Sequence, residues 1–150
     1  MRIAIASDHR GVLIKAKLVT ALAADGHSVE DLGTHGEQSV DYPDYAKAVG
    51  KLVAHGQVDR GILICGTGIG MAITANKFPG VRAASCNDEI MAEMSRKHND
   101  VNVLCLPGDM IGNRPVTDLV RVWLSTEFEG GRHSRRLEKI AELESRQTEH

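Results

Sequence analysis

Gly61-Ile-Leu-Ile-Cys65-Gly-Thr-Gly-Ile-Gly70-Met-Ala is the stretch from which we infer the fold. It predicts a buried strand at 61–64 that ends in the Cys65 thiol, then a glycine turn, then the start of a helix. Glycines permit positive φ and let backbone N–H groups approach a ligand closely, and a helix N-terminus adds partial positive charge. The turn therefore predicts a cradle for an anion. Its residues are Gly66, Thr67, Gly68, Ile69 and Gly70.

The rest of the chain repeats this order of strand, polar turn and helix. Because the strands are continuously apolar and alternate with helices, we expect parallel pairing with helices on both faces. The sequence therefore predicts a single-domain three-layer α/β/α fold over 1–150. The other strands are expected at 2–6, 28–32, 81–85 and 103–106. Helices are expected over 13–22, from Pro43 to about 52, from Gly68 to about Lys77, around 90–94, and from Pro115 to 124. Asn87-Asp88 and Asn113 are expected to cap the last two of these helices.

In such a fold, ligands bind outside the carboxyl ends of the strands, at the point where the strand order changes direction. The residues expected there are Ser7 to Gly11, Cys65 to Gly70 and the segment around His98. Asp8 and His9 directly follow the first strand, where Asp8 could act as a helix cap, as a site residue, or as both. We expect His98 near the same cleft.

Cys65 has two interpretations. A helix dipole and several N–H donors beside it would favour the thiolate, which is a useful base near neutral pH. The structural alternative is a small hydrophobic residue buried at the end of a strand. We favour the reactive interpretation because of the adjoining glycines, whereas Cys86 and Cys105 lack such a loop and are expected to be structural. The three cysteines are spaced too widely for a metal knuckle or a redox pair.

Composition excludes several classes of function. Eighteen Lys and Arg against 20 Asp and Glu leave a formal charge of −2, which gives no support to binding of nucleic acid or membrane surfaces. With no leader pattern after Met1 and no run near the ~20 apolar residues of a spanning helix, we expect a cytoplasmic protein. Aromatic residues, at 3%, are too few for base stacking, so a small polar ligand fits better.

Nucleotide-binding motifs are also excluded. A dinucleotide fingerprint has its third glycine one residue later than here, where Met71 stands, and no Gly-Lys-Ser/Thr closes the turn as in a Walker loop. After Gly130-Gly131, a last helix is predicted over 133–146, with no strand behind it. This helix could pack on its own sheet or reach across to a second subunit. Its start carries a basic cluster, Arg132, His133, Arg135 and Arg136.

Six motifs now stand in order along nearly the whole chain. They are Ser-Asp8-His9-Arg-Gly11, Asp41-Tyr42-Pro43, the 61–70 stretch, Ala75-Asn76-Lys77, Ser95-Arg-Lys-His98-Asn99-Asp100 and Glu129-Gly130-Gly131-Arg132-His133. Together they closely resemble the type B ribose-5-phosphate isomerases, a family that includes the galactose-6-phosphate isomerase subunits. The resemblance implies a Rossmann-like sheet of five parallel strands, a homodimer or dimer of dimers, and a reaction that uses no metal and no cofactor.

The resemblance further implies aldose–ketose isomerisation of a phosphorylated sugar, with ribose 5-phosphate as the expected substrate, through a cis-enediolate. Cys65 would move the proton between C1 and C2, and His98 would assist ring opening. The amides of 66–70 would hold the enediolate oxygen. The remaining substrate contacts would be Asp8, Thr67 and Asn99 on sugar hydroxyls, Tyr42 beside them, and His9, Arg132 and Arg136 on the phosphate, the two arginines reaching a neighbouring subunit's site.

Asp109 departs from that family. The ribose-phosphate branch commonly carries an Arg, another phosphate contact, in the loop after the fifth strand. Either the remaining Arg and His residues suffice, or the ligand differs at its far end, as allose 6-phosphate, galactose 6-phosphate or a tetrose phosphate would. Asp109 could pair with Arg114 or another local base. A module that binds a sugar phosphate without turning it over is the alternative from another class.

Overall fold

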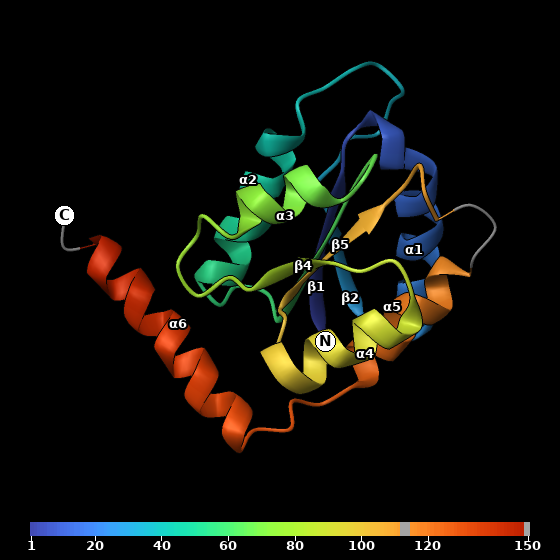
Figure 1. Cartoon of the computed structure of the whole chain (residues 1–150). Helices are drawn as coiled ribbons and strands as arrows, with labels where there is room; N and C mark the ends of the chain where they lie inside the picture. Colours follow the sequence, from blue (N-terminus) through green and yellow to red (C-terminus); the bar gives the residue numbers. More distant parts are fainter. Residues whose placement is uncertain (112–114, 149–150) are drawn as a thin grey trace.

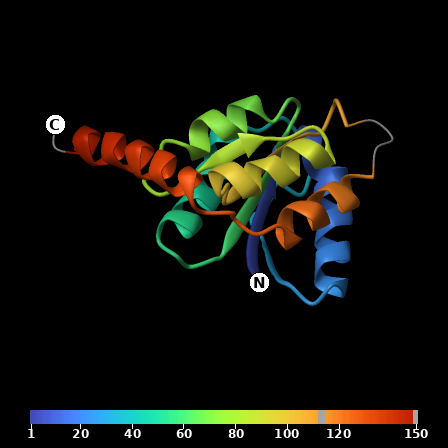
Figure 2. The ribbon, with the colours of Figure 1, turned by 60° about the horizontal axis from the view of Figure 1, so that its bottom comes forward.

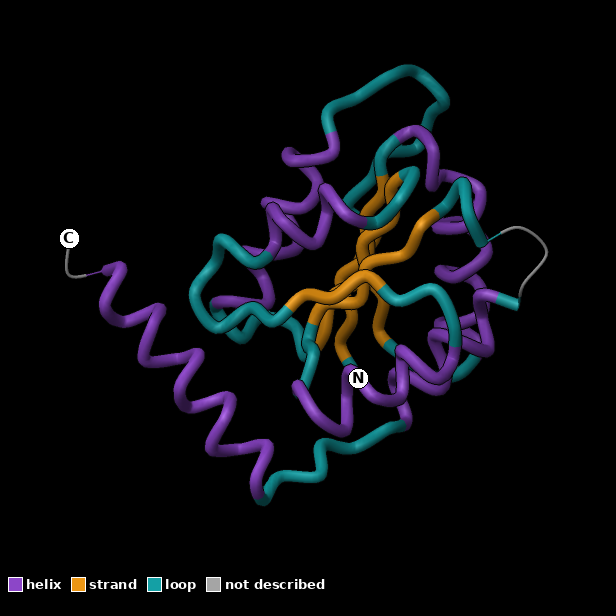
Figure 3. The backbone as a smooth tube through the Cα atoms, viewed as in Figure 1, coloured by secondary structure: helices purple, strands orange, loops and turns teal. Residues whose placement is uncertain are grey.

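A sheet lies at the centre of the molecule (Figures 1 and 3), and all of its strand pairs are parallel. The structure is a computed structural model that describes residues 1–111 and 115–148. Its strands follow the spatial order β2-β1-β3-β5-β4, which confirms the predicted five-stranded parallel sheet. The strands are β1 (Arg2–Ser7), β2 (Ser28–Asp31), β3 (Arg60–Cys65), β4 (Ala83–Ser85) and β5 (Val103–Pro107).

Helices cover both faces of the sheet. Because alternate strand residues point to opposite faces, Ile62 and Ile64 join the core beneath α1, α4 and α5, whereas Leu63 and Cys65 join the core beneath α2 and α3. This confirms the three-layer architecture (Figure 1). The helices are α1 (Val12–Ala24), α2 (Tyr42–Ala54), α3 (Ile69–Ala75), α4 (Glu89–Asn99), α5 (Val116–Ser125) and α6 (Arg132–Thr148), with a short 3₁₀ helix, η1 (His9–Gly11).

Side-chain caps set where two helices begin. The Asp88 carboxylate accepts a hydrogen bond from the N–H of Met91 at 2.8 Å and so caps α4, as predicted. Asp8 caps η1 in the same way, accepting from the N–H of Arg10 at 2.9 Å. The cap predicted at Asn113 lies outside the described residues.

α3 ends earlier than predicted, at Ala75 instead of about Lys77. The side chain of the next residue, Asn76, accepts from the N–H of Ala83 at 2.8 Å and donates to its carbonyl at 2.9 Å. These two bonds attach the end of α3 to the first residue of β4, and this attachment stops the helix.

The strand order changes direction between β1 and β3. From β1 the chain moves to β2 on one side, and from β3 it moves to β5 and β4 on the other. Ser7 lies opposite Ile64, and the N–H of Asp8 donates to the Ile64 carbonyl at 3.0 Å. Asp8 and Cys65 therefore leave the carboxyl edge of the sheet side by side, which is where this class of fold binds ligands.

α6 extends from the body of the molecule (Figure 2). The N–H of Gly80 donates to the Glu144 carboxylate at 3.2 Å, but a hollow of about 470 Å³ separates the helix from the β4 side of its own sheet. Leu137, Ile140 and Leu143 line this hollow, and Leu143 is 58% exposed. The apolar face of α6 is therefore not closely packed on its own sheet. No helix within the described ranges is long and apolar enough to span a bilayer.

Lys15 of α1 is a buried charge, only 2% exposed. Its ammonium group contacts both carboxylate oxygens of Asp31, at 2.7 and 2.8 Å. Burial raises the pKa of Asp31, but the bonds from Lys15 and from the N–H of Gly33 outweigh burial, so the pKa lies below its usual value. The pair ties α1 to the end of β2.

Asp31→Asn should lower the free energy of unfolding by about 3–5 kcal/mol, because it leaves the buried Lys15 ammonium without its counter-charge. Asp25→Asn is the matched control, since Asp25 also pairs at 2.8 Å, but with the exposed Arg121. Exposed pairs contribute little to stability, so this control should change it only slightly. Urea denaturation measures both, and equal losses would contradict the assignment of a buried charge to Lys15.

Candidate active site

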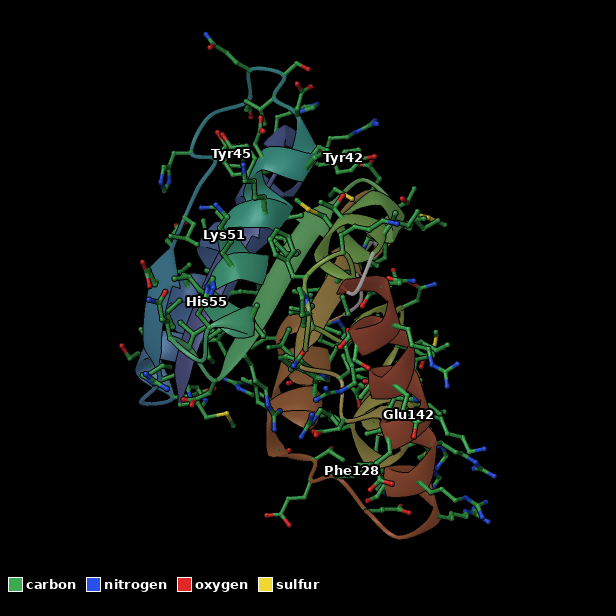
Figure 4. The ribbon with its side chains drawn as sticks, turned by 90° about the vertical axis from the view of Figure 1, so that its left-hand side faces the viewer. Tyr42, Tyr45, Lys51, His55, Phe128 and Glu142 are labelled. Carbon is green, nitrogen blue, oxygen red and sulfur yellow. The ribbon has the colours of Figure 1, made fainter. Side chains whose placement is uncertain are left out.

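A hollow of about 780 Å³ opens where β1 and β3 end. It gathers the turn after β1, the start of α2 and the glycine loop before α3. Figure 4 shows Tyr42 at the start of α2, on this side of the molecule. The lining residues are Asp8, His9, Arg10, Val40, Asp41, Tyr42, Pro43, Asp44, Cys65, Gly66, Thr67, Ile69, Gly70 and Ile73. The structure thus brings together most of the site residues predicted near the carboxyl edge.

Cys65 is the last residue of β3 and lines this hollow, although it is only 5% exposed. Part of its surface packs in the core beneath α2 and α3. The other two cysteines lie outside the hollow, and burial raises the pKa of both the Cys86 and the Cys105 thiol. Cys65 is therefore the thiol that a ligand in this hollow would meet.

The loop from Gly66 to Gly70 contains main-chain donors without partners. Within the described part of the chain, no carbonyl accepts a hydrogen bond from the N–H groups of Gly66, Thr67, Gly68 or Gly70. The N–H of Ile69 donates to the Thr67 hydroxyl at 3.2 Å. Because backbone N–H groups are obligatory donors, these four are open to a ligand or to water.

Two glycines of this loop are required by their surroundings. Gly68 has a φ of 76°, and a Cβ there would lie 2.7 Å from the Ser85 hydroxyl and 3.1 Å from the Leu106 carbonyl carbon. A Cβ on Gly70 would lie 2.5 Å from Cζ of Tyr42. The absence of side chains therefore lets the loop approach β5, and lets the Tyr42 ring lie directly against the loop.

Asp8 and His9 are held in place by backbone groups. The Asp8 carboxylate, in a residue only 5% exposed, accepts from the N–H of Arg10, so the cap and site interpretations of Asp8 are compatible. Nδ1 of His9 accepts from the N–H of Val40 at 3.2 Å. With Nδ1 as the acceptor, Nε2 carries the ring proton of the neutral imidazole and can donate to a ligand.

Asp109 pairs with Arg10, which the sequence analysis placed near the cleft within Ser7 to Gly11 but to which it gave no role. Its carboxylate lies 2.8 Å from Nε of Arg10, which follows Asp8 and His9 on the turn after β1. Arg114, the partner considered from the sequence, lies outside the described residues. Arg10 lines the hollow, and so do Asp41 and Asp44. The only sequence signal that Arg10, Asp41 and Asp44 belong to the site was their position beside Asp8-His9 and Tyr42.

His98 does not lie near the cleft, and that prediction is wrong for a single chain. α4 runs antiparallel to the strands, so His98 at its end lies at the amino edge of the sheet, before β5 begins at Val103. The cleft lies at the opposite edge, where Cys65 is opposite Pro107. Each helix carries the chain from the carboxyl edge of the sheet back to the amino edge, where the next strand begins. A residue at the end of a helix therefore lies away from the cleft, which the spacing along the sequence did not indicate for His98.

A second cluster forms at that other edge. The ring of His98 stacks on that of His133 with centroids 4.4 Å apart, and Asn99 lines the hollow beside α6. Arg132 and Arg136 belong to the first turns of α6. Figure 4 shows Phe128, which precedes α6, at the far end of the molecule from Tyr42. One chain therefore divides the predicted site residues between two ends.

His133 is buried in this second cluster. Burial, the neighbouring His98 and the positive charge of Arg132 lower the pKa of His133, which favours its neutral form. Together with Glu129, the two histidines are the one group of potential metal ligands that comes close among the described residues, within 4.8 Å. Their rings are nearly parallel, at 14°, so their nitrogen lone pairs lie in separate planes and do not converge on one ion. The arrangement does not fit a metal centre.

Comparison with known proteins gives one consistent family. The model of the Ribose/Galactose Isomerase family matches residues 3–140. Ribose-5-phosphate isomerase B of Escherichia coli is 45% identical over 145 residues, which cover 97% of each chain. The chain is therefore similar to this enzyme over almost its full length.

Two solved structures are similar to the whole fold. Ribose-5-phosphate isomerase B of Clostridium thermocellum superposes with a TM-score of 0.95 at 49% identity, covering 97% of this chain and 99% of that one. The Mycoplasma genitalium enzyme, solved with bound ribulose-5-phosphate, has a TM-score of 0.92 at 40% identity and covers 96% of both.

Gly68→Ala should destabilise the protein more than Gly26→Ala. Both glycines have positive φ, 76° and 92°, which costs an alanine about 1–2 kcal/mol. A Cβ at 26 would meet nothing within 4 Å, whereas the one at 68 would meet Ser85 and Leu106 and should cost about 1–3 kcal/mol more. Denaturant titration compares the two variants. Equal losses would mean that the loop does not need its close approach to β5.

Proposed function

Since the chain belongs to the ribose/galactose isomerase family and is a sugar phosphate isomerase, we propose that it interconverts ribose 5-phosphate and ribulose 5-phosphate. The observation that carries this proposal is the position of Cys65, in the same hollow as the unpartnered amides of the glycine loop. The related Mycoplasma enzyme with bound ribulose-5-phosphate supports the choice of sugar.

The proposed base is the Cys65 thiolate. It takes the proton from C2 of the open-chain aldose, the released electron pair forms the C1–C2 double bond, and the C1 oxygen becomes negative. The O2 hydroxyl proton passes to O1, and the carbon proton returns to C1, which leaves the carbonyl at C2. No redox partner is needed, because the two carbons exchange oxidation state within one molecule.

The glycine loop is proposed to stabilise the enediolate. The N–H groups of Gly66, Thr67, Gly68 and Gly70 have no acceptor among the described residues, so they need no reorganisation when the negative oxygen forms, and one such donor is typically worth ~2.7–4 kcal/mol. Asp8 and Thr67 line the same hollow and are proposed to bond the sugar hydroxyls, with the Tyr42 ring closing one side. His9 is proposed to donate to the phosphate through Nε2.

We propose that a second copy of the chain completes the site. Three carboxylates line the hollow, those of Asp8, Asp41 and Asp44, against one guanidinium, that of Arg10, so a phosphate dianion there needs further cations from elsewhere. The first turns of α6 carry such cations. The rim of the hollow also exposes apolar side chains, with Ile69 at 57% and Ile73 at 59%, that a neighbour could cover.

The completed site would join both clusters. His98 of one copy would assist ring opening, and Asn99 would bond a hydroxyl, in the site where Cys65 of the other copy acts. Arg132 and Arg136 would bind the phosphate, since their guanidinium groups suit its geometry. We therefore propose a homodimer or a dimer of dimers with shared sites.

Cys65→Ala should lower isomerisation by roughly 10²–10⁴-fold, the usual contribution of a general base, and leave the fold intact. The assay follows ketose formation and deuterium exchange at C2 in deuterium oxide. Cys86→Ala is the matched control, since Cys86 is a buried free thiol outside the hollow. Full activity of Cys65→Ala would remove Cys65 from the role of base.

The same assay tests the substrate. Ribose 5-phosphate should give the highest kcat/KM in a panel with allose 6-phosphate, galactose 6-phosphate and tetrose phosphates. If another sugar phosphate were preferred, ribose 5-phosphate would be the wrong substrate. The difference would then lie at the far end of the ligand, where Asp109 departs from the family. Binding of the panel without turnover or exchange would instead support a non-catalytic module.

Mixing Cys65→Ala chains with Arg136→Ala chains should restore activity. Half of randomly mixed dimers contain one chain of each kind, and each of these has one intact site of two, so recovery should reach about a quarter of the wild-type rate. Cys65→Ala mixed with Asp8→Ala is the control, because both changes affect the same half of the site. No recovery in verified mixed dimers would place each site within one chain.

A further inference from the structure

The turn after β5 is fixed to the glycine loop by backbone bonds. The N–H of Gly108 donates to the Cys65 carbonyl at 2.8 Å, and that of Asp109 donates to the Gly66 carbonyl at 3.1 Å. A Cβ on Gly66 would lie 2.9 Å from the Asp109 carboxylate. The position of this carboxylate relative to Cys65 is therefore set by main-chain geometry.

Arg10 meets Asp109 directly above Gly66. Its backbone N–H is held by the Asp8 carboxylate, and its Cδ lies 3.3 Å from the position of a Cβ on Gly66. The ion pair with Asp109 uses Nε, at 2.8 Å. No described residue bonds the two terminal nitrogens of Arg10, so one edge of the guanidinium is tethered while its outer donors are free.

Folding does not account for this ion pair. The side chains of Arg10 and Asp109 are 59% and 41% exposed, and exposed pairs contribute little to stability because water and salt screen them. Arg10 of this pair lines a hollow that three carboxylates also line. Without Arg10, the Asp109 carboxylate beside Gly66 would add a fourth negative charge near the hollow, which would repel an anionic ligand.

We infer that Arg10 binds the phosphate group of the substrate, and that Asp109 is a positioning residue that orients the Arg10 guanidinium. Among the described residues that line the hollow, Arg10 is the permanent cation, and His9 lies next to it in the chain. A guanidinium bonded through Nε alone retains four N–H donors, which can form paired bonds to two phosphate oxygens. This inference rests on the proposed function for the identity of the ligand as a sugar phosphate.

Arg10→Gln should raise the Kd for ribose 5-phosphate roughly 10- to 100-fold, the effect of losing a charge-assisted contact, and should leave the Kd for ribose unchanged. Calorimetry in a Cys65→Ala background measures binding without turnover. In the enzyme with Cys65 intact, KM should rise similarly and kcat should stay within about threefold. Arg2→Gln is the matched control: Arg2 pairs with Asp59 at similar exposures, 56% and 43%, at the other edge of the sheet.

The effect of Asp109→Asn should depend on Arg10. With Arg10 present, this change releases the guanidinium and should weaken ribose 5-phosphate binding about threefold or more. In the Arg10→Gln background the same change removes a repulsive charge and should strengthen binding. An effect of the same sign and size in both backgrounds would contradict the positioning role of Asp109.

Two results would overturn the role of Arg10: an unchanged Kd for ribose 5-phosphate in Arg10→Gln, or an equal loss for ribose, which carries no phosphate. Failure of the proposed function is a separate result, namely wild-type protein that neither binds nor converts ribose 5-phosphate. In that case inorganic phosphate is the probe, and Arg10→Gln should still weaken its binding. Phosphate binding that does not depend on Arg10 would overturn the inference on its own.

Discussion

Parallel pairing of β1 with β3 is the constraint on which the site depends. The register that sets Ser7 opposite Ile64 brings the turn with Asp8, His9 and Arg10 beside the turn that begins at Cys65. Neither turn forms a hollow alone. The pairing of β3 with β5 then adds Asp109 from a third turn. Three strand ends that are far apart in sequence thus converge because their hydrogen-bond ladders leave them no other arrangement.

Features set by neighbouring residues could be predicted from the sequence. Apolar runs gave the strands, Asp88 and Asp8 gave caps, and the glycines after Cys65 gave a loop with free amides. Each of these depends on backbone geometry or on burial over a few residues. The motifs also predicted the family, and the family comparison confirms that prediction.

Features set by distant contacts could not be predicted in this way. His98 was misplaced because its side of the sheet depends on the direction of α4, and the Arg10–Asp109 pair was missed because it joins residues about 100 positions apart. The structure also separates the carboxylate-lined hollow from the basic start of α6. In the proposed dimer, the basic start of α6 of each copy would face the carboxylate-lined hollow of the other, so opposite charges would meet twice.

Strand length at the margins of the sheet restricts how that pair can form. β2 has four residues and β4 has three, so each margin exposes few main-chain groups that a second sheet could extend. A dimer in which the β-sheet continues from one molecule into the other is therefore disfavoured. In the proposed dimer, association would use helix surfaces and turns, where single side chains determine the fit, so partner choice could change in evolution while the strand register stays as it is.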